Sequence, residues 1–156
     1  IGRLPTSILD VGYGSGDFLR VCHNAGIISY GSDISNHPLP KGVLSVRDKV
    51  EDPYDVITFF DSLEHMEDIS FVKNLKCNYV VISVPSCNHP EDEEWFSSWK
   101  HLRPDEHLWH FSPHALTKFM KENGYNLIKQ EIIEDDIRVD PNNTPNIISG
   151  VYKKIC

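Results

Sequence analysis

Apolar and polar positions along this chain follow two alternating patterns. Short runs that are almost wholly apolar predict strands covered on both faces of a sheet. Stretches with apolar residues three or four positions apart predict amphipathic helices between those strands. The predicted strands are Ser7–Val11, Ile27–Ser32, Val43–Val46, Tyr54–Phe60, Tyr79–Val84, Tyr125–Glu134 and Ile147–Lys154.

Three helices are predicted between the strands. The first carries its apolar face between Phe18 and Ala25 and ends at Gly26, and the second covers 68–75. The third begins at Ser112-Pro113, a good cap followed by a proline, and ends at Gly124. Alternating strands and helices predict an α/β fold. We expect a Rossmann-like, doubly wound sheet of about seven strands, mostly parallel, with an antiparallel hairpin of the last two strands at its edge.

Residues 86–111 depart from both patterns. They show no simple periodicity and contain prolines, acids, histidines and all three tryptophans. A loop of this length inside a compact domain is usually functional, and the aromatic side chains argue against disorder. We therefore expect residues 1–156 to form a single domain, with 86–111 as an insert that covers the substrate. The first strand begins so early that either the fold lacks a helix before it or the sequence is truncated at its start.

Composition limits the possible partners. The chain has 156 residues and a net charge of −8, with acids spread along its length. This charge argues against nucleic acid or an anionic membrane as the main partner, and no apolar run approaches the roughly 20 residues of a membrane span.

The four cysteines form no CxxC pair, so reduced thiols in a cytoplasmic protein are expected. The sequence leaves the oligomeric state open.

A glycine-rich turn follows the first predicted strand. Asp10 is followed by Gly12, Gly14 and Gly16 at alternate positions, and a helix begins directly afterwards. Glycines let a ligand approach the backbone closely, and the helix start directs free N–H groups at the turn. The spacing differs from the GxGxxG of dinucleotide sites. Because an acid at the strand end repels a pyrophosphate but suits an ammonium group, the turn favours a nucleotide-like cofactor that carries an ammonium.

This acid-x-Gly-x-Gly-x-Gly pattern resembles motif I of the class I S-adenosylmethionine-dependent methyltransferases. The second motif of that family is similar to residues 31–35, and residues 54–65 resemble its strand-four stretch ending in Leu-Glu-His. Residues 80–85 resemble its fifth strand. The closing residues His107, 110–112 and 124–125 are similar to the ending of many small-molecule and sugar methyltransferases. The resemblance spans nearly the whole chain.

The resemblance implies S-adenosylmethionine as methyl donor and S-adenosylhomocysteine as product. Asp10 would orient the ammonium, directly or through water, and Asp33 would bind both ribose hydroxyls. Asp48 would reach the adenine amino group, or is a solvated loop acid. The remaining implied cofactor residues are Gly12, Tyr13, Gly14 and Gly16 in the turn, Ile34 beside the adenine, and Phe60 and Asp61 at the end of the fourth strand. Residues 33–54 are shorter than usual for the family, which opens the adenine side.

Candidate bases come from three histidines. Methyl transfer to oxygen or nitrogen is assisted by a base of near-neutral pKa, and histidine is the usual choice. His65 follows the fourth strand, where open α/β sheets bind ligands; alternatively, it only packs the start of a helix. His107 and His110 lie in the long segment and either contact the substrate or anchor the loop.

Two further features of this segment have alternative interpretations. Trp95, Trp99 and Trp109 form either an apolar wall for the acceptor or the core that holds the segment down. His101, His107, His110 and His114 include helical spacings that suit a metal. Pro113 breaks such a helix and no cysteine is near, so no metal is expected.

The sequence thus predicts an S-adenosylmethionine-dependent methyltransferase that acts on the oxygen or nitrogen of a small-molecule acceptor, such as a sugar or other metabolite. Two alternatives remain. One is a catalytically silent module that binds the same cofactor, and the other is a nicotinamide-dependent oxidoreductase.

Overall fold

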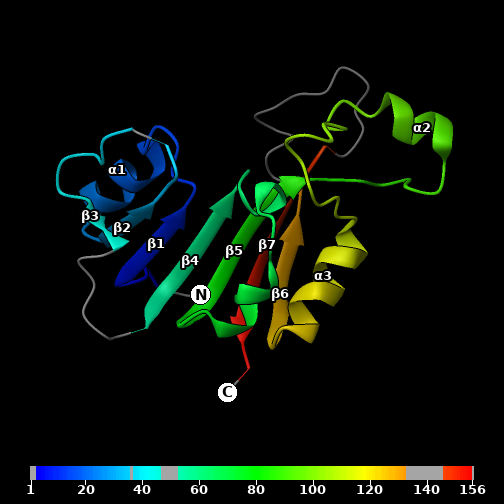
Figure 1. The fold of residues 1–156 in the computed structure, drawn as a ribbon. Helices are drawn as coiled ribbons and strands as arrows, with labels where there is room; N and C mark the ends of the chain where they lie inside the picture. The colour runs from blue at the N-terminus through cyan, green and yellow to red at the C-terminus, as the bar shows by residue number, and fades with distance from the viewer. Residues whose placement is uncertain (1–2, 36, 47–52, 133–145, 156) are drawn as a thin grey trace.

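A computed structural model describes residues 3–35, 37–46, 53–132 and 146–155 (Figure 1). Its strands are β1 (Ser7–Val11), β2 (Ile28–Ser32), β3 (Leu44–Ser45), β4 (Tyr54–Phe60), β5 (Cys77–Pro85), β6 (Tyr125–Glu131) and β7 (Ile147–Lys154). Its helices are α1 (Asp17–Asn24), α2 (Glu93–Ser98) and α3 (Pro113–Glu122), with the 3₁₀ turns η2 (Leu63–His65) and η3 (Ser70–Asn74). Within these ranges, no helix is long and apolar enough to cross a membrane.

The strands form one seven-stranded sheet in the order β3-β2-β1-β4-β5-β7-β6. Strands β1 to β5 pair in parallel, whereas β7 is antiparallel to both β5 and β6. The predicted fold class is confirmed, including the antiparallel pair at the edge. The chain moves outward from β1 to β2 and β3, then returns to place β4 on the other side of β1. Open sheets bind ligands outside the strand ends at such a reversal.

Successive apolar side chains along the strands point to opposite faces of the sheet, so each face has its own hydrophobic core. Ile8 and Val56 point to one face, where they pack with Leu19 and Cys22 of α1. Ile57 and Phe59 point to the other face, in the core that contains Leu116 and Met120 of α3. Because side chains alternate along a strand, Asp10 and Thr58 lie on the α1 face.

The helix boundaries follow local chemistry. Helix α3 begins where the Ser112 hydroxyl accepts a 3.1 Å hydrogen bond from the backbone N–H of Ala115. Helix α1 is followed by Gly26 at φ 83°, as the sequence predicts. The expected helix over 68–75 is only the 3₁₀ turn η3. Just before it, the Asp68 carboxylate accepts the Ser70 N–H at 2.7 Å.

Residues 86–111 form an excursion that is tied together at its base. Ser86 and Phe111 form a bridge, and the Cys87 N–H donates to the Phe111 carbonyl at 2.9 Å. The segment contains α2, a short helix that periodicity did not reveal and that is capped by Asp92. It lies beyond the end of the sheet toward which β4 and β5 run (Figure 1).

Candidate functional site

A cavity of about 670 Å³ lies at the carboxyl ends of β1, β2 and β4. The loop after β1 contributes Gly12 and Gly14, and the loop after β2 contributes Asp33 and Ile34. The loop after β4 contributes Asp61, Ser62 and His65. The cavity therefore occupies the crevice at the reversal of strand order, where the topology favours ligand binding.

The glycine turn is shaped by two different constraints. At Gly12, φ is 84° and an added Cβ would lie 2.5 Å from the Cβ of Ser62. Ser62 in turn donates to the Val11 carbonyl at 2.6 Å, so only glycine lets the loops after β1 and β4 approach this closely. At Gly14, φ is 51° and an added Cβ would meet nothing within 4 Å. Gly14 thus borders open space on the cavity.

Asp33 joins the loop after β2 to the glycine turn. Its Oδ2 accepts the Gly14 N–H at 2.8 Å, and its Oδ1 accepts the Ser35 N–H at 2.6 Å. Partial burial disfavours the charged form, but these backbone hydrogen bonds outweigh it and lower the pKa of Asp33. Each carboxylate oxygen keeps acceptor capacity for a further donor.

Asp10 lies below the turn and is 3% exposed. Its Oδ1 accepts a 2.6 Å hydrogen bond from the Thr58 hydroxyl. Burial raises the pKa of Asp10 to about 6, against the effect of that hydrogen bond, and the charge of Asp33 raises it further. A cationic ligand in the cavity would favour the ionised form of both carboxylates.

Of the other cofactor residues predicted from the sequence, only some line the cavity. Ile34 is fully exposed at the cavity, and Asp61 adopts a φ of 48°, a conformation that non-glycine residues rarely take outside constrained sites. Phe60 packs edge-on against Phe18 of α1, with ring centroids 4.9 Å apart. Tyr13 donates its hydroxyl to the His37 carbonyl at 2.7 Å. Asp48 and Gly16 remain: Asp48 lies outside the described residues, and Gly16 precedes α1 at φ 75°.

Two of the three candidate histidines lie together. His65 lines the cavity, and its ring centroid is 4.7 Å from that of His107. Nδ1 of His65 lies 2.8 Å from the Glu106 carbonyl oxygen, and Nδ1 of His107 lies 2.8 Å from the His101 carbonyl oxygen. Burial lowers the pKa of His107, which favours its neutral form.

The third histidine belongs to an aromatic cluster. His110 contacts Phe96 and Trp99 edge-on, at centroid distances of 5.5 and 5.3 Å. Trp95 stacks on Trp99 at 5.8 Å. Burial lowers the pKa of His110. These contacts support the alternative in which Trp95, Trp99 and His110 pack the long segment.

Trp109 instead joins the long segment to the cavity wall. Its Nε1–H donates to the Met66 carbonyl at 2.7 Å, and Met66 lines the cavity. The backbone N–H groups of Leu108 and Trp109 donate to the Glu64 carbonyl at 2.8 and 3.2 Å. Residues 106–109 are therefore docked along η2.

Sequence reasoning missed part of the cavity wall. Met66, Glu67 and Asp68 line it together with the expected residues, and Glu64 lies beside it with 1% exposure. The sequence feature that could have indicated these residues is the high density of acidic residues just after the fourth strand. With Asp33 and Asp61, these carboxylates make the cavity negative, which favours a cationic ligand.

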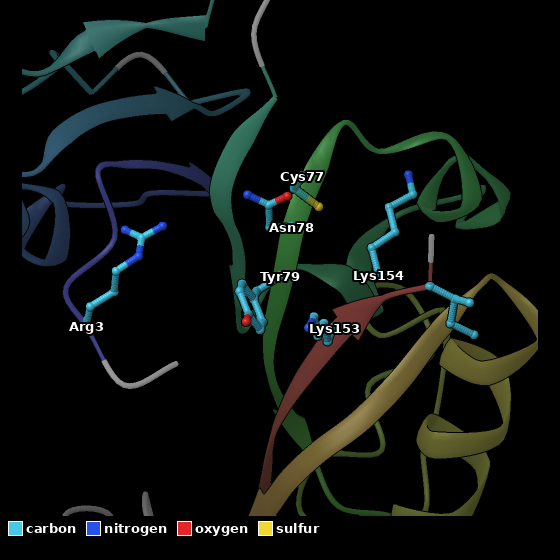
Figure 2. Close-up of a pocket in the computed structure, with 7 residues that line it drawn as sticks. Arg3, Cys77, Asn78, Tyr79, Lys153 and Lys154 are labelled. Atoms are coloured by element: carbon cyan, nitrogen blue, oxygen red, sulfur yellow. The ribbon is translucent and has the colours of Figure 1, made fainter.

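A second cavity, of about 440 Å³, lies at the opposite end of the sheet (Figure 2). It is lined by Arg3, Lys153 and Lys154. Arg3 forms a 3.3 Å ion pair with Asp55, and the Lys154 ammonium donates to the Leu75 carbonyl. Because Arg3 and Lys154 already have partners, the cavity at the carboxyl ends is the better candidate site.

Comparison with known proteins identifies the family of the chain. The profile of a family described as methyltransferase domain matches residues 2–130. None of the curated proteins is a significant match to the sequence.

Solved structures share the fold at low sequence identity. The 1,6-didemethyltoxoflavin-N1-methyltransferase of Burkholderia thailandensis, solved with S-adenosylhomocysteine, is 15% identical with a TM-score of 0.69, covering 99% of this chain and 73% of that one. Magnesium protoporphyrin IX methyltransferase of Synechocystis, also with S-adenosylhomocysteine, is 16% identical with a TM-score of 0.65, covering 98% and 76%. The [4+2]-cyclase SpnF is 13% identical with a TM-score of 0.66, covering 96% and 74%.

Proposed function

We propose that this protein methylates an oxygen or nitrogen of a small molecule. A sugar or another polar metabolite fits this description. The premise is that the chain belongs to the methyltransferase domain family and is an S-adenosylmethionine-dependent methyltransferase. The observation that carries the proposal is the single cavity in which the glycine turn, Asp33 and His65 meet. That cavity offers a cofactor cradle and a candidate activating group in the same space.

We assign the cofactor to the side of the cavity formed by β1 and β2. Gly12 and Gly14 would let the methionine and ribose portion approach the backbone. The Asp33 carboxylate accepts one backbone N–H on each oxygen, so its remaining lone pairs can accept the two ribose hydroxyls. The negative charge of Asp10 below the turn suits the cofactor's ammonium and sulfonium charges.

The charge of the wall restricts the acceptor. Asp33, Asp61, Glu67 and Asp68 all line the cavity. Their carboxylates repel phosphate groups and favour neutral or cationic molecules. This supports a small, phosphate-free acceptor over nucleic acid, in agreement with the net charge of −8.

Activation of the acceptor is assigned to His65. Methyl transfer from a sulfonium is a direct displacement, so the protein must align the acceptor atom with the methyl group and exclude water. The carbonyl of Glu106 can only accept, so Nδ1 of His65 carries the hydrogen and Nε2 presents its lone pair. His65, which lines the cavity, thus keeps a free lone pair on Nε2.

The long segment is the proposed cover of the acceptor within a single domain. Residues 106–109 are tied to η2 through the Glu64 carbonyl and to the cavity wall through Met66. The rest of the segment, which contains α2, stands beyond the sheet (Figure 1). Acceptor specificity would therefore depend on 86–111, whereas cofactor binding would depend on β1 and β2.

The proposal is tested by a screen of neutral and cationic metabolites with methyl-labelled S-adenosylmethionine. We expect label transfer to a small molecule, and loss of that transfer in His65→Asn with unchanged binding of S-adenosylhomocysteine. Cofactor binding without turnover on any acceptor would instead support a silent binding module. Binding of NAD in place of S-adenosylhomocysteine would contradict the cofactor assignment.

A further inference from the structure

Three side chains with metal-ligating atoms converge beside the cofactor cavity. Glu64 and His65 lie in η2, directly after β4, and His107 reaches them from the long segment. One ligand atom from each residue lies within 4.8 Å of the other two. Glu64 is 1% exposed and His107 is 8% exposed, whereas the side chain of His65 is 39% exposed toward the cavity.

Backbone hydrogen bonds and one ring contact hold this cluster in place. The Glu64 carbonyl accepts the N–H groups of Leu108 and Trp109 at 2.8 and 3.2 Å. The His65 ring is bound to the carbonyl of Glu106. These contacts fix residues 106–109 against η2, so His107 is brought to Glu64 by main-chain hydrogen bonds. A metal site requires ligand side chains that are held in place before the ion binds, as these are.

Both imidazoles are oriented as metal ligands are. Nδ1 of each ring lies 2.8 Å from a backbone carbonyl oxygen, which can only accept. Nδ1 therefore carries the hydrogen in both rings, and the lone pair remains on Nε2. Metal-binding histidines almost always donate their other ring N–H to a carbonyl or carboxylate, which fixes the tautomer and the ring. Nε2 of His65 lies 4.0 Å from Oε1 of Glu64.

The spacing of the three ligand atoms suits a bound cation. One atom from each residue already lies within 4.8 Å of the other two. Around an ion with bonds of about 2.1 Å, tetrahedral ligand atoms lie about 3.4 Å apart, so small side-chain rotations would close the observed set on an ion.

We propose that Glu64, His65 and His107 form a binding site for a divalent transition-metal cation beside the cofactor cavity. Two imidazole nitrogens and one carboxylate oxygen suit ions such as Zn²⁺, Fe²⁺ or Co²⁺ better than Mg²⁺ or Ca²⁺, which prefer oxygen ligands. Three protein ligands leave coordination positions open, as in catalytic metal sites. This set differs from the four-histidine set in the long segment, because its acid and one histidine come from η2.

The chemical role rests on the proposed function. A hydroxyl of the acceptor bound to the cation becomes more acidic and releases its proton to solvent water. The oxygen lone pair then forms a bond to the methyl carbon, and the C–S bond breaks with its electron pair returning to sulfur. The products are the methyl ether, neutral S-adenosylhomocysteine and one proton. The activation assigned to His65 would thus be exercised through the cation that it binds.

The binding test uses Co²⁺ as the probe, titrated into the full chain after treatment with a chelator. Visible absorption of Co²⁺ reports its coordination, and Zn²⁺ should displace it. We expect binding of one equivalent, weakened at least about tenfold in Glu64→Gln and in His65→Asn. His114→Asn, an exposed histidine in α3, is the matched control and should bind Co²⁺ as the wild type does. Circular dichroism confirms that each variant is folded.

The outcomes separate this inference from the proposed function. No Co²⁺ binding, or equal binding by folded Glu64→Gln and His65→Asn, would overturn the metal site even if S-adenosylhomocysteine binds and methyl transfer proceeds. Co²⁺ binding that follows the predicted variants would support the site even if no acceptor is found. Methyl transfer that is unaffected by the chelator would overturn the role of the cation and leave His65 as a direct base.

Discussion

The carboxylate of Asp33 accepts a 2.8 Å hydrogen bond from the backbone N–H of Gly14. This contact links the acid at the end of β2 to the turn after β1, two positions that lie apart in sequence. It places the two predicted cofactor-binding motifs on one wall of the cavity. The position of Asp33 is thus part of the same structure that shapes the glycine turn.

Replacing Asp33 with asparagine should weaken cofactor binding. Asparagine offers one acceptor oxygen where the carboxylate has two, so either the Gly14 or the Ser35 contact is lost, together with the charge that would bind the ribose. Hydrogen bonds to charged groups contribute about 1.5–3 kcal/mol, which corresponds to a loss of about 10- to 150-fold in affinity. Calorimetry with S-adenosylhomocysteine measures this loss. Asp17→Asn removes an exposed carboxylate of α1 and should leave the affinity unchanged.

Replacing Asp10 with asparagine should stabilise the ligand-free protein at high pH. The pKa of Asp10 is raised to about 6 from 3.8 by burial, so the folded state holds the proton to higher pH than the unfolded state. Stability is therefore lost as the pH rises from about 4 to about 6. The asparagine side chain would keep an acceptor for the Thr58 hydroxyl without this loss.

The size of that effect follows from the shift. A shift of about two units corresponds to about 3 kcal/mol. Urea titrations give the free energy of unfolding of the variant and the wild type at pH 4 and at pH 8. The advantage of the variant over the wild type should be larger at pH 8 than at pH 4, by up to about 3 kcal/mol. A difference that is the same at both pH values would show that Asp10 ionises normally in the folded protein.

Gly14→Ala and Gly124→Ala form a matched pair. Both glycines have positive φ, 51° and 88°, and an added Cβ would meet nothing within 4 Å at either. Each substitution should cost about 1–2 kcal/mol of stability from backbone strain. Only Gly14 borders the cavity, so only Gly14→Ala should also reduce the affinity for S-adenosylhomocysteine. Equal affinities in the two variants would remove the turn from the cofactor site.

Trp109→Phe should loosen the contact between the long segment and η2. Phenylalanine keeps a large apolar ring but lacks the N–H that donates to the Met66 carbonyl. Hydrogen exchange at the backbone amides of positions 108 and 109, which bond to the Glu64 carbonyl, should become faster. Trp95→Phe lies in α2 and should not change exchange at these amides. Unchanged exchange in Trp109→Phe would mean that the segment is held by other contacts.

Much of the fold was predictable because its strands carry strong periodic signals. Tyr54–Phe60 is almost wholly apolar, since both faces of that strand are covered, and its predicted bounds match those of β4. The bounds of β7 also match. Helix α2 was missed because its six residues are too few to show a period.

The site was only partly predictable because its parts meet through tertiary contacts. The glycine turn, Asp33 and His65 lie at strand ends, and topology alone brings strand ends together. The approach of His107 to Glu64 depends on main-chain hydrogen bonds between η2 and a segment without periodicity. No spacing in the sequence encodes that contact.

The central claim is that the cavity at the reversal of strand order binds S-adenosylmethionine. Its most direct test is a calorimetric titration of the full chain with S-adenosylhomocysteine, alongside Gly14→Ala and Gly124→Ala. We predict saturable binding at one site in the wild type and in Gly124→Ala, and markedly weaker binding in Gly14→Ala. A folded wild-type protein that binds no S-adenosylhomocysteine would contradict the claim.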